Sequence, residues 1–97
     1  MRYSLHPAAE EDLRQAAMYY QERAGNTLSQ SLLTEFEHSI NILLEHPRLG
    51  AFWRHDKRRY VMKHFPYSLI YTISDKEIRI WAAAHQSRHP GYWSKRK

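Results

Sequence analysis

The chain has 97 residues, 42% of them hydrophobic and 13% aromatic, so we expect one modest core and a single domain over residues 1–97. It contains no cysteine, which excludes disulfides, thiolate metal ligands and a cysteine nucleophile. The net charge of +5 is unevenly distributed, because residues 1–47 sum to −4 and residues 48–97 sum to +9. The basic half favours an anionic partner, either nucleic acid or an acidic protein segment, although a merely solubilising surface charge is the alternative.

The first residues predict a short strand followed by a helix. Residues 2–5 (RYSL) have strand character but are too few to be stable without a neighbouring strand. Pro7 suits the first turn of a helix, and a stripe of small and apolar side chains carries this helix to about Arg23, before Gly25 stops it. The acidic triplet at residues 10–12 complements the positive end of the helix dipole, which explains it better than a metal or acid–base cluster does.

A second helix follows after only a few residues, so the two helices should form an antiparallel hairpin. It opens with a capping-box pattern at Thr27 and ends at His46, because a residue before proline avoids helical backbone angles. Residues 48–57 then form a basic loop, and its two aromatic side chains, Phe52 and Trp53, are expected to tuck back onto the core.

Residues 58–93 organise the chain as three strands and a tail. Residues 59–65 are rich in strand-forming types and stop before Pro66, whereas residues 67–73 and 78–85 alternate with period 2. The whole pattern predicts an α+β fold of order β-α-α-β-β-β, in which the helical hairpin packs on one face of a mainly antiparallel sheet that recruits residues 2–5.

The alternation assigns the strand residues to two faces. Ala82 and Ala84 should share the covered face with the core residues. The expected core contacts join Leu13, Tyr20, Leu32, Phe36, Ile40 and Leu43 of the helices to Leu69, Tyr71, Ile78 and Ile80. The opposite, basic and aromatic face should carry Arg59, Val61, Lys63, Ser68, Thr72, Arg79, Trp81 and His85.

No membrane span, metal site or cofactor is predicted. No apolar run approaches the roughly 18 residues that a bilayer requires, and no signal peptide opens the chain, so we expect a soluble cytoplasmic protein without a membrane partner. His85 and His89 are four residues apart, but they fall on a strand end and a loop, where this spacing does not bring them together. The three glycines form no phosphate-binding loop.

Three segments carry a recognisable pattern: HPRLG at 46–50, RRYVMKHFPYSLIY at 58–71 and IRIWAAAHQSRHPGYW at 78–93. Together they resemble the RelE/ParE superfamily, the toxins of bacterial type II toxin–antitoxin pairs. The resemblance implies the fold described above and a growth-inhibiting toxin. It also implies that a cognate acidic antitoxin neutralises the toxin in a hetero-oligomer.

One branch of this superfamily, the RelE-like toxins, cleaves mRNA on the ribosome. Arg59 and Tyr92 match residues of that branch, but Ser68 and Gln86 stand where the branch carries arginines. Loss of one such phosphate-stabilising cation can cost a few kcal/mol in the transition state. If the protein is nevertheless a metal-independent endoribonuclease, its catalytic groups should come from Arg59, Lys63, His85, Arg88 and Tyr92.

The ending AAAHQSRHPGYW looks closer to the ParE-like branch, whose members resemble inhibitors of DNA gyrase and have no known catalytic centre. We therefore expect a toxin that binds gyrase rather than an enzyme. A non-toxic, basic nucleic-acid-binding module is a further alternative, although no groove-reading motif is present. The expected partner- and target-binding residues are Arg58, Arg59, Lys63, Trp81, His85, Arg88, Tyr92 and Trp93.

Overall fold

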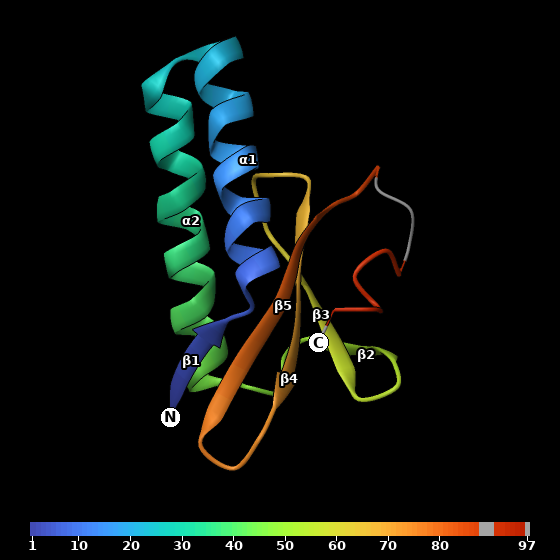
Figure 1. Cartoon of the computed structure of the whole chain (residues 1–97). Coiled ribbons are helices and arrows are strands. Elements are labelled where there is room, and N and C mark those ends of the chain that lie inside the picture. Colours follow the sequence, from blue (N-terminus) through green and yellow to red (C-terminus); the bar gives the residue numbers. More distant parts are fainter. Residues whose placement is uncertain (88–90, 97) are drawn as a thin grey trace.

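In the computed structural model, which describes residues 1–87 and 91–96, two helices lie along one side of a five-stranded sheet (Figure 1). The elements in chain order are β1 (Arg2–Leu5), α1 (Pro7–Ala24), α2 (Asn26–Glu45), β2 (Ala51–Arg54), β3 (Lys57–Val61), β4 (Tyr67–Ile73) and β5 (Glu77–His85). This arrangement confirms the predicted α+β fold and adds one strand, β2, within the region expected to be a loop.

The strand order across the sheet is β1-β5-β4-β3-β2. Consecutive strands from β2 to β5 pair antiparallel, whereas β1 pairs parallel with β5, in a register that places Tyr3 opposite Ile78. The four residues of β1 thus gain the neighbour that so short a strand requires, as expected. β3 ends at Val61, four residues before the predicted end at Phe65, so the alternation of faces stops there.

The helix boundaries follow the local sequence closely. Pro7 opens α1, and the His6 ring accepts a hydrogen bond from the backbone N–H of Ala8 at 3.0 Å. Gly25 links the two helices with φ of +89°, a conformation that favours glycine. The predicted capping box at Thr27 is wrong, because α2 begins directly after Gly25 without a side-chain cap. Neither helix of the described chain is long and apolar enough to cross a bilayer.

The helix-side core joins both helices to β4 and β5. Nine of the ten predicted core residues have at most 7% of their surface exposed, and Tyr20 packs against them while only partly buried. Those nine are Leu13, Leu32, Phe36, Ile40, Leu43, Leu69, Tyr71, Ile78 and Ile80. The period-3.6 and period-2 patterns therefore identify this core correctly.

An irregularity in the pairing of β4 and β5 changes which way the later residues of β5 face. Ile70 pairs with Ala82 but the next residue, Tyr71, pairs with Ile80, which leaves Trp81 as an extra residue. Such a bulge shifts the alternation of faces by one position. Ala83 consequently joins the helix-side core.

Ala82 and Ala84 consequently lie on the other face of the sheet. There Ala82 forms a second apolar cluster with Ile70 and Trp93, and Ala84 packs against it. Their predicted place on the covered face is wrong, because the alternation is not continuous through β5. His85 follows the shifted pattern, and its ring meets Tyr67 of the helix-side core edge-on, with centroids 5.0 Å apart.

Asp12 connects α1 to the irregular part of β5 and to the tail. Its carboxylate accepts hydrogen bonds from the backbone N–H of Ala83 at 3.1 Å and from both terminal nitrogens of Arg96, at 2.7 and 3.1 Å. Arg96 also donates to the carbonyl of Trp81 at 2.9 Å. The side chains of Asp12 and Arg96 are only 11% and 16% exposed, so we call this pair the Asp12–Arg96 clamp.

The HPRLG segment packs around the hydroxyl of Tyr71. This hydroxyl donates to the carbonyl of Pro47 at 2.7 Å and accepts from the N–H of Gly50 at 2.9 Å. A Cβ atom at Gly50 would lie 2.6 Å from the hydroxyl oxygen, so only glycine fits without a shift. Burial raises the pKa of Tyr71, although the Gly50 N–H and the charge of Arg58 oppose this effect.

The segment expected to be a loop, residues 48–57, contains β2, which pairs with β3 through an irregular register between Phe52 and Arg54. Trp53 packs against the second apolar cluster, as predicted. Phe52 does not tuck in, because 67% of its surface is exposed and the Arg58 guanidinium lies 3.9 Å from its ring centroid.

Candidate functional site

The face of the sheet that turns away from the helices, here called the second face, is partly covered by the chain's own tail. Residues 91–96 turn back over it on the side opposite α1 and α2 (Figure 1). Trp93 is only 2% exposed and packs on Ile70 and Ala82, and its ring centroid lies 5.4 Å from that of Trp53. Burial therefore removes Trp93 from the accessible surface on which we expected it.

Cationic side chains surround the three tryptophans of this face. Lys57 lies 4.9 Å from the Trp81 ring and 5.9 Å from the Trp93 ring, while Arg79 lies 5.5 Å from Trp81. Two arginines lie over Trp53, Arg54 at 5.2 Å and Arg59 at 5.5 Å. The Trp–cation face comprises Trp53, Trp81, Trp93, Arg54, Lys57, Arg59 and Arg79. Each cation–π interaction contributes roughly 0.5–1 kcal/mol at an exposed site, so these interactions favour the observed positions of the lysine and arginine side chains.

A pocket of about 290 Å³ opens on the second face where the tail crosses β3, β4 and β5. We call it the sheet-side pocket. Its lining residues are Trp53, Arg59, Val61, Ser68, Ile70, Ala84, His85, Gln86, Tyr92 and Trp93. Tertiary structure thus brings Arg59, His85 and Tyr92 together from three separate segments.

The sheet-side pocket carries little positive charge inside. Among the described residues that line it, Arg59 is the only lysine or arginine. Ser68 is 6% exposed and Gln86 is exposed, and both are uncharged. Arg59 alone can hold a single anionic group there by a charge-assisted hydrogen bond.

His85 lies at the border between the two faces. Its Nδ1 accepts a hydrogen bond from the Ser87 N–H at 3.0 Å, and the Ser87 hydroxyl oxygen lies 2.7 Å away. When the ring is neutral, this arrangement leaves the proton on Nε2. The ring also lines a neighbouring pocket of about 330 Å³, shared with Asp12, Tyr67 and Tyr92.

Tyr67 and Tyr92 differ in their surroundings. Burial raises the pKa of Tyr67 to about 12, helped by the nearby Tyr20, Tyr19, Tyr92 and Asp12, so its phenol stays protonated at neutral pH. The Tyr92 hydroxyl lies 3.4 Å from the carboxylate of Asp12, at the long end of hydrogen-bond distance. Tyr92 therefore belongs both to the tail and to the wall between the two pockets.

The other predicted site residues lie elsewhere. Arg58 is on the opposite side of β3 from Arg59 and donates to the carbonyls of Arg48 and Gly50, at 3.1 and 2.8 Å. Lys63 instead lines a groove beside α2. Its predicted place on the same face as Arg59 is wrong, because β3 ends at Val61 and the alternation of faces does not extend to Lys63.

Arg88, like His89, lies outside the described residues. Trp81 is on the Trp–cation face, where its indole N–H donates to the Thr72 hydroxyl at 3.0 Å.

Sequence patterns missed two contributors to this site. Trp53 becomes a wall of the pocket only because β2 pairs with β3, and a basic loop segment gives no sign of that pairing. The Asp12–Arg96 clamp joins residues 84 positions apart. In the sequence, Asp12 is simply one of three acidic residues near the start of a helix, where they complement the helix dipole. Within the described residues, no three histidine, aspartate or glutamate side chains are grouped so that they could hold a metal ion.

Two comparisons with known proteins bear on identity. The profile of the family described as "ParE toxin of type II toxin-antitoxin system, parDE" matches residues 3–90. A solved structure titled "Chromosomal ParDE TA system from P. aeruginosa" superposes with a TM-score of 0.78 at 18% identity, over 88% of this chain and 95% of that chain. No curated protein matches significantly. Because the family profile spans most of the chain, this protein belongs to the ParE toxin family of type II toxin–antitoxin systems.

Proposed function

We propose that this toxin inhibits growth by binding DNA gyrase in the cytoplasm, without covalent chemistry, and that a cognate acidic antitoxin neutralises it in a hetero-oligomer. Family membership and the fold shared with a ParDE system support the toxin and antitoxin parts of this proposal. The basic second half of the chain, at +9, supports an acidic partner.

The observation that carries the non-covalent mechanism is the contrast between the sheet-side pocket and the surface around it. The pocket has a single described cation, Arg59, whereas the Trp–cation face outside it carries three more. A binding protein needs aromatic anchors and peripheral charge, both of which this face has. Phosphate cleavage needs several cations preorganised at the scissile group, and Ser68 and Gln86 supply none.

The direct test is a supercoiling assay with purified gyrase and purified toxin. We expect the protein to inhibit supercoiling and Arg59→Glu to weaken the inhibition by about tenfold, because the substitution reverses the charge beside Trp53. Arg2→Glu is the matched control, since Arg2 is an exposed arginine on β1, at the far edge of the sheet. Unimpaired supercoiling at saturating toxin would refute gyrase as the target. Salt-sensitive binding of DNA or RNA without a growth defect would support the non-toxic module instead.

Cleavage of mRNA is the second candidate, because Arg59, His85 and Tyr92 line one pocket. These residues provide the types needed to stabilise a phosphate and to move protons to and from ribose oxygens. Transcript ends should be mapped after induction of the toxin without its antitoxin. Codon-phased cleavage that disappears in His85→Ala or Tyr92→Phe, but persists in the exposed control Tyr3→Phe, would establish the nuclease and overturn our proposal. Intact transcripts together with a DNA-damage response would support gyrase inhibition.

A further inference from the structure

A groove of about 920 Å³ opens at the end of the molecule where α2 finishes. Its walls come from the C-terminal end of α2, residues 46–49, β2, β3 and the β4–β5 turn, with Met1 beside them. The end of α2, the N-terminus and the β4–β5 turn lie at the same end of the molecule (Figure 1). We call this hollow the end groove, and it shares no residue with the Trp–cation face.

Exposed apolar side chains gather around the end groove. Leu49 is 55% exposed, Phe52 67% and Met1 56%, and all three line it. Large apolar side chains that are exposed singly are common on proteins, whereas a group of them around a hollow is typical of an interaction site. The end groove therefore has the apolar centre of a protein–protein interface.

Arg58 fixes the segment that carries these apolar side chains. Its guanidinium donates to the carbonyls of Arg48 and Gly50, at 3.1 and 2.8 Å, and lies 3.9 Å from the centroid of the Phe52 ring. The Tyr71 hydroxyl accepts a further hydrogen bond from the Gly50 N–H at 2.9 Å. A surface that is already ordered loses little conformational freedom when a partner covers it, so more of the gain from burial remains as affinity.

The end groove carries both signs of charge, although it lies in the basic half of the chain. Residues 48–97 contain only three acidic side chains, and two of them, Asp56 and Asp75, line the groove together with Glu45. Arg48 and Arg58 line it as well. A uniformly acidic segment or a nucleic acid would meet three carboxylates here, whereas a surface with both signs can match a second copy of itself.

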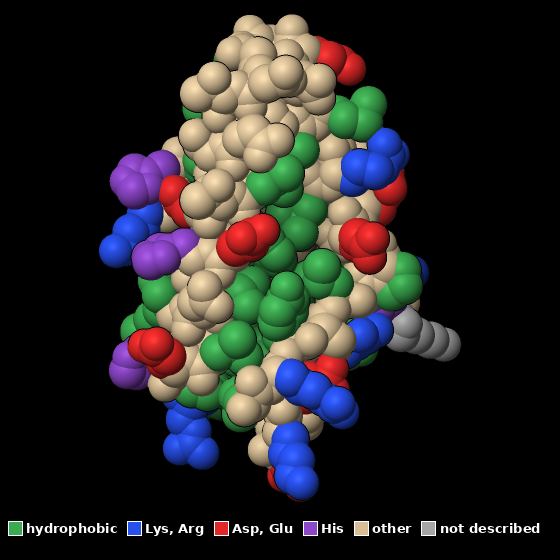
Figure 2. All heavy atoms as spheres, turned by 90° about the vertical axis from the view of Figure 1, so that its left-hand side faces the viewer, with side chains coloured by type: hydrophobic (Ala, Val, Ile, Leu, Met, Phe, Trp, Pro, Cys, Tyr) green, Lys and Arg blue, Asp and Glu red, His purple; other side chains and the backbone are tan. Residues whose placement is uncertain are grey.

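Three of these charges are available to a second molecule. Glu45, Arg48 and Asp75 are exposed, and none of them forms an ion pair with another residue that the structure describes. The space-filling view of the α2 side shows acidic and basic side chains bordering the apolar surface (Figure 2).

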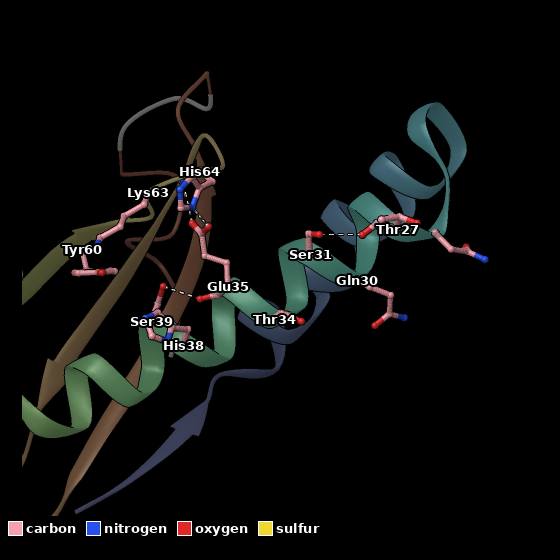
Figure 3. Close-up of a pocket in the computed structure, with 11 residues that line it drawn as sticks. Thr27, Gln30, Ser31, Thr34, Glu35, His38, Ser39, Tyr60, Lys63 and His64 are labelled. Atoms are coloured by element: carbon pink, nitrogen blue, oxygen red, sulfur yellow. Dashed lines mark hydrogen bonds and ion pairs between the residues drawn. The ribbon is translucent and has the colours of Figure 1, made fainter.

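The groove beside α2, which Lys63 lines, has no such balance of charge. Among the described residues that line it, Glu35 is the only acidic one. Its carboxylate accepts a hydrogen bond from the His64 N–H at 2.9 Å, and its other oxygen lies 2.6 Å from the His64 ring (Figure 3). Because that carboxylate is engaged within the chain, the groove beside α2 offers no free anion to a second copy.

We propose that the end groove is the contact surface of a symmetric homodimer, an inference that does not depend on the proposed gyrase activity. In a two-fold pair the same residues meet on both sides, so Leu49 and Phe52 of the two copies pack at the centre. Arg48 of each copy then faces carboxylates of the other. The Trp–cation face shares no residue with the end groove, so the dimer presents that face twice.

Sedimentation of the purified toxin over a range of concentrations tests the dimer. We expect reversible association with a dissociation constant of about 10–100 μM. Leu49→Asp should associate at least about tenfold more weakly, because it places a charge at the apolar centre. Met18→Asp is the matched control, since Met18 is 44% exposed on α1 and does not line the groove. Equal association of the two variants, or a wild-type chain that stays monomeric at roughly 500 μM, would overturn the proposal.

A charge-exchange experiment tests the symmetry of the contact. Arg48→Glu should associate with itself at least about tenfold more weakly than the wild type, because it adds a fourth carboxylate to each surface. Mixing it with Glu45→Arg or with Asp75→Arg should restore association in at least one mixture, because the reversed charges then face each other. Arg23→Glu, at an exposed arginine on α1 outside the groove, should associate as the wild type does. Weak association in both mixtures would show that identical surfaces do not meet.

Two further outcomes separate the homodimer from other occupants and from the proposed activity. If the toxin alone is monomeric and Leu49→Asp weakens binding of the acidic protein encoded beside this gene, the end groove belongs to that complex and the homodimer is overturned. If the toxin dimerises through the end groove but leaves gyrase uninhibited, the homodimer stands and the proposed activity fails.

Discussion

The two faces of the sheet differ in the side chains that they carry. The helix-side face buries aliphatic and aromatic side chains against two long helices, and its central residues, such as Leu69 and Ile80, are fully buried. The second face instead stacks tryptophans with lysine and arginine under a short tail.

This contrast explains how each face is stabilised. Removal of apolar surface from water stabilises the helix-side core at about 25 cal/mol per Å². The second face depends on the Asp12–Arg96 clamp and on the bulge in β5 to keep its tail in place. One face therefore maintains the fold, while the other combines aromatic rings with cationic side chains.

The sharpest test of this contrast compares two phenylalanines. Phe36 is 6% exposed in the helix-side core, so Phe36→Ala should lower the free energy of unfolding by about 3–5 kcal/mol. Phe52 is 67% exposed, and Phe52→Ala should change it by no more than about 0.5 kcal/mol. Urea denaturation measures both values. A near-normal melting temperature for Phe36→Ala would show that the helix-side core is assigned wrongly.

Breaking the Asp12–Arg96 clamp should affect the second face in particular. Asp12→Asn leaves a largely buried guanidinium without its anion, and we expect a loss of about 2–4 kcal/mol together with a change in tryptophan fluorescence as Trp93 becomes exposed. Glu11→Gln, at the neighbouring exposed carboxylate, should change neither signal. If Asp12→Asn lost stability without any change in the Trp93 environment, the tail would not depend on the clamp.

The hydroxyl of Tyr71 offers a smaller, local test on the helix-side face. Tyr71→Phe keeps the ring but leaves the Pro47 carbonyl and the Gly50 N–H without their partner, which should cost about 1–3 kcal/mol. Tyr3→Phe, on an exposed ring, should cost nothing measurable. Equal melting temperatures of the two variants would mean that water replaces the lost hydroxyl.

The smallest expected effect concerns alkaline pH. The pKa of Tyr67 in the folded protein, about 12, lies above its ordinary value of 10, so the fold favours the protonated phenol. This contribution to stability is fully present below pH 10 and is lost as the pH rises from about 10 toward 12. In an ultraviolet titration, Tyr67→Phe should lack the last tyrosine to ionise, and its stability should fall less steeply over that interval. Ionisation of every tyrosine near pH 10 would contradict this.

The sequence by itself determines the helical hairpin and the helix-side core. Proline at the start of α1, glycine between the helices and proline after α2 act through local backbone geometry, which needs no knowledge of the fold. The alternation through β4 likewise identifies Leu69 and Tyr71 as buried, because one face of a covered sheet has to be apolar. Residues 46–50 and 58–93 also carried enough of the superfamily's pattern to indicate a toxin.

The sequence correctly predicted that Arg59, Arg79 and Trp81 share the second face. Only the tertiary structure decided how the end of β5 and the tail are arranged on it. The bulge at Trp81 reverses the facing of the residues after it, and no sequence period signals a one-residue insertion into a ladder. Arg96 pairs with Asp12, which lies 84 positions away in the sequence. Trp93 is buried against Ile70 and Ala82, which lie side by side only once β4 and β5 are paired. Contacts of this kind depend on where the folded chain brings distant segments together, whereas local patterns report only the conformation of neighbouring residues.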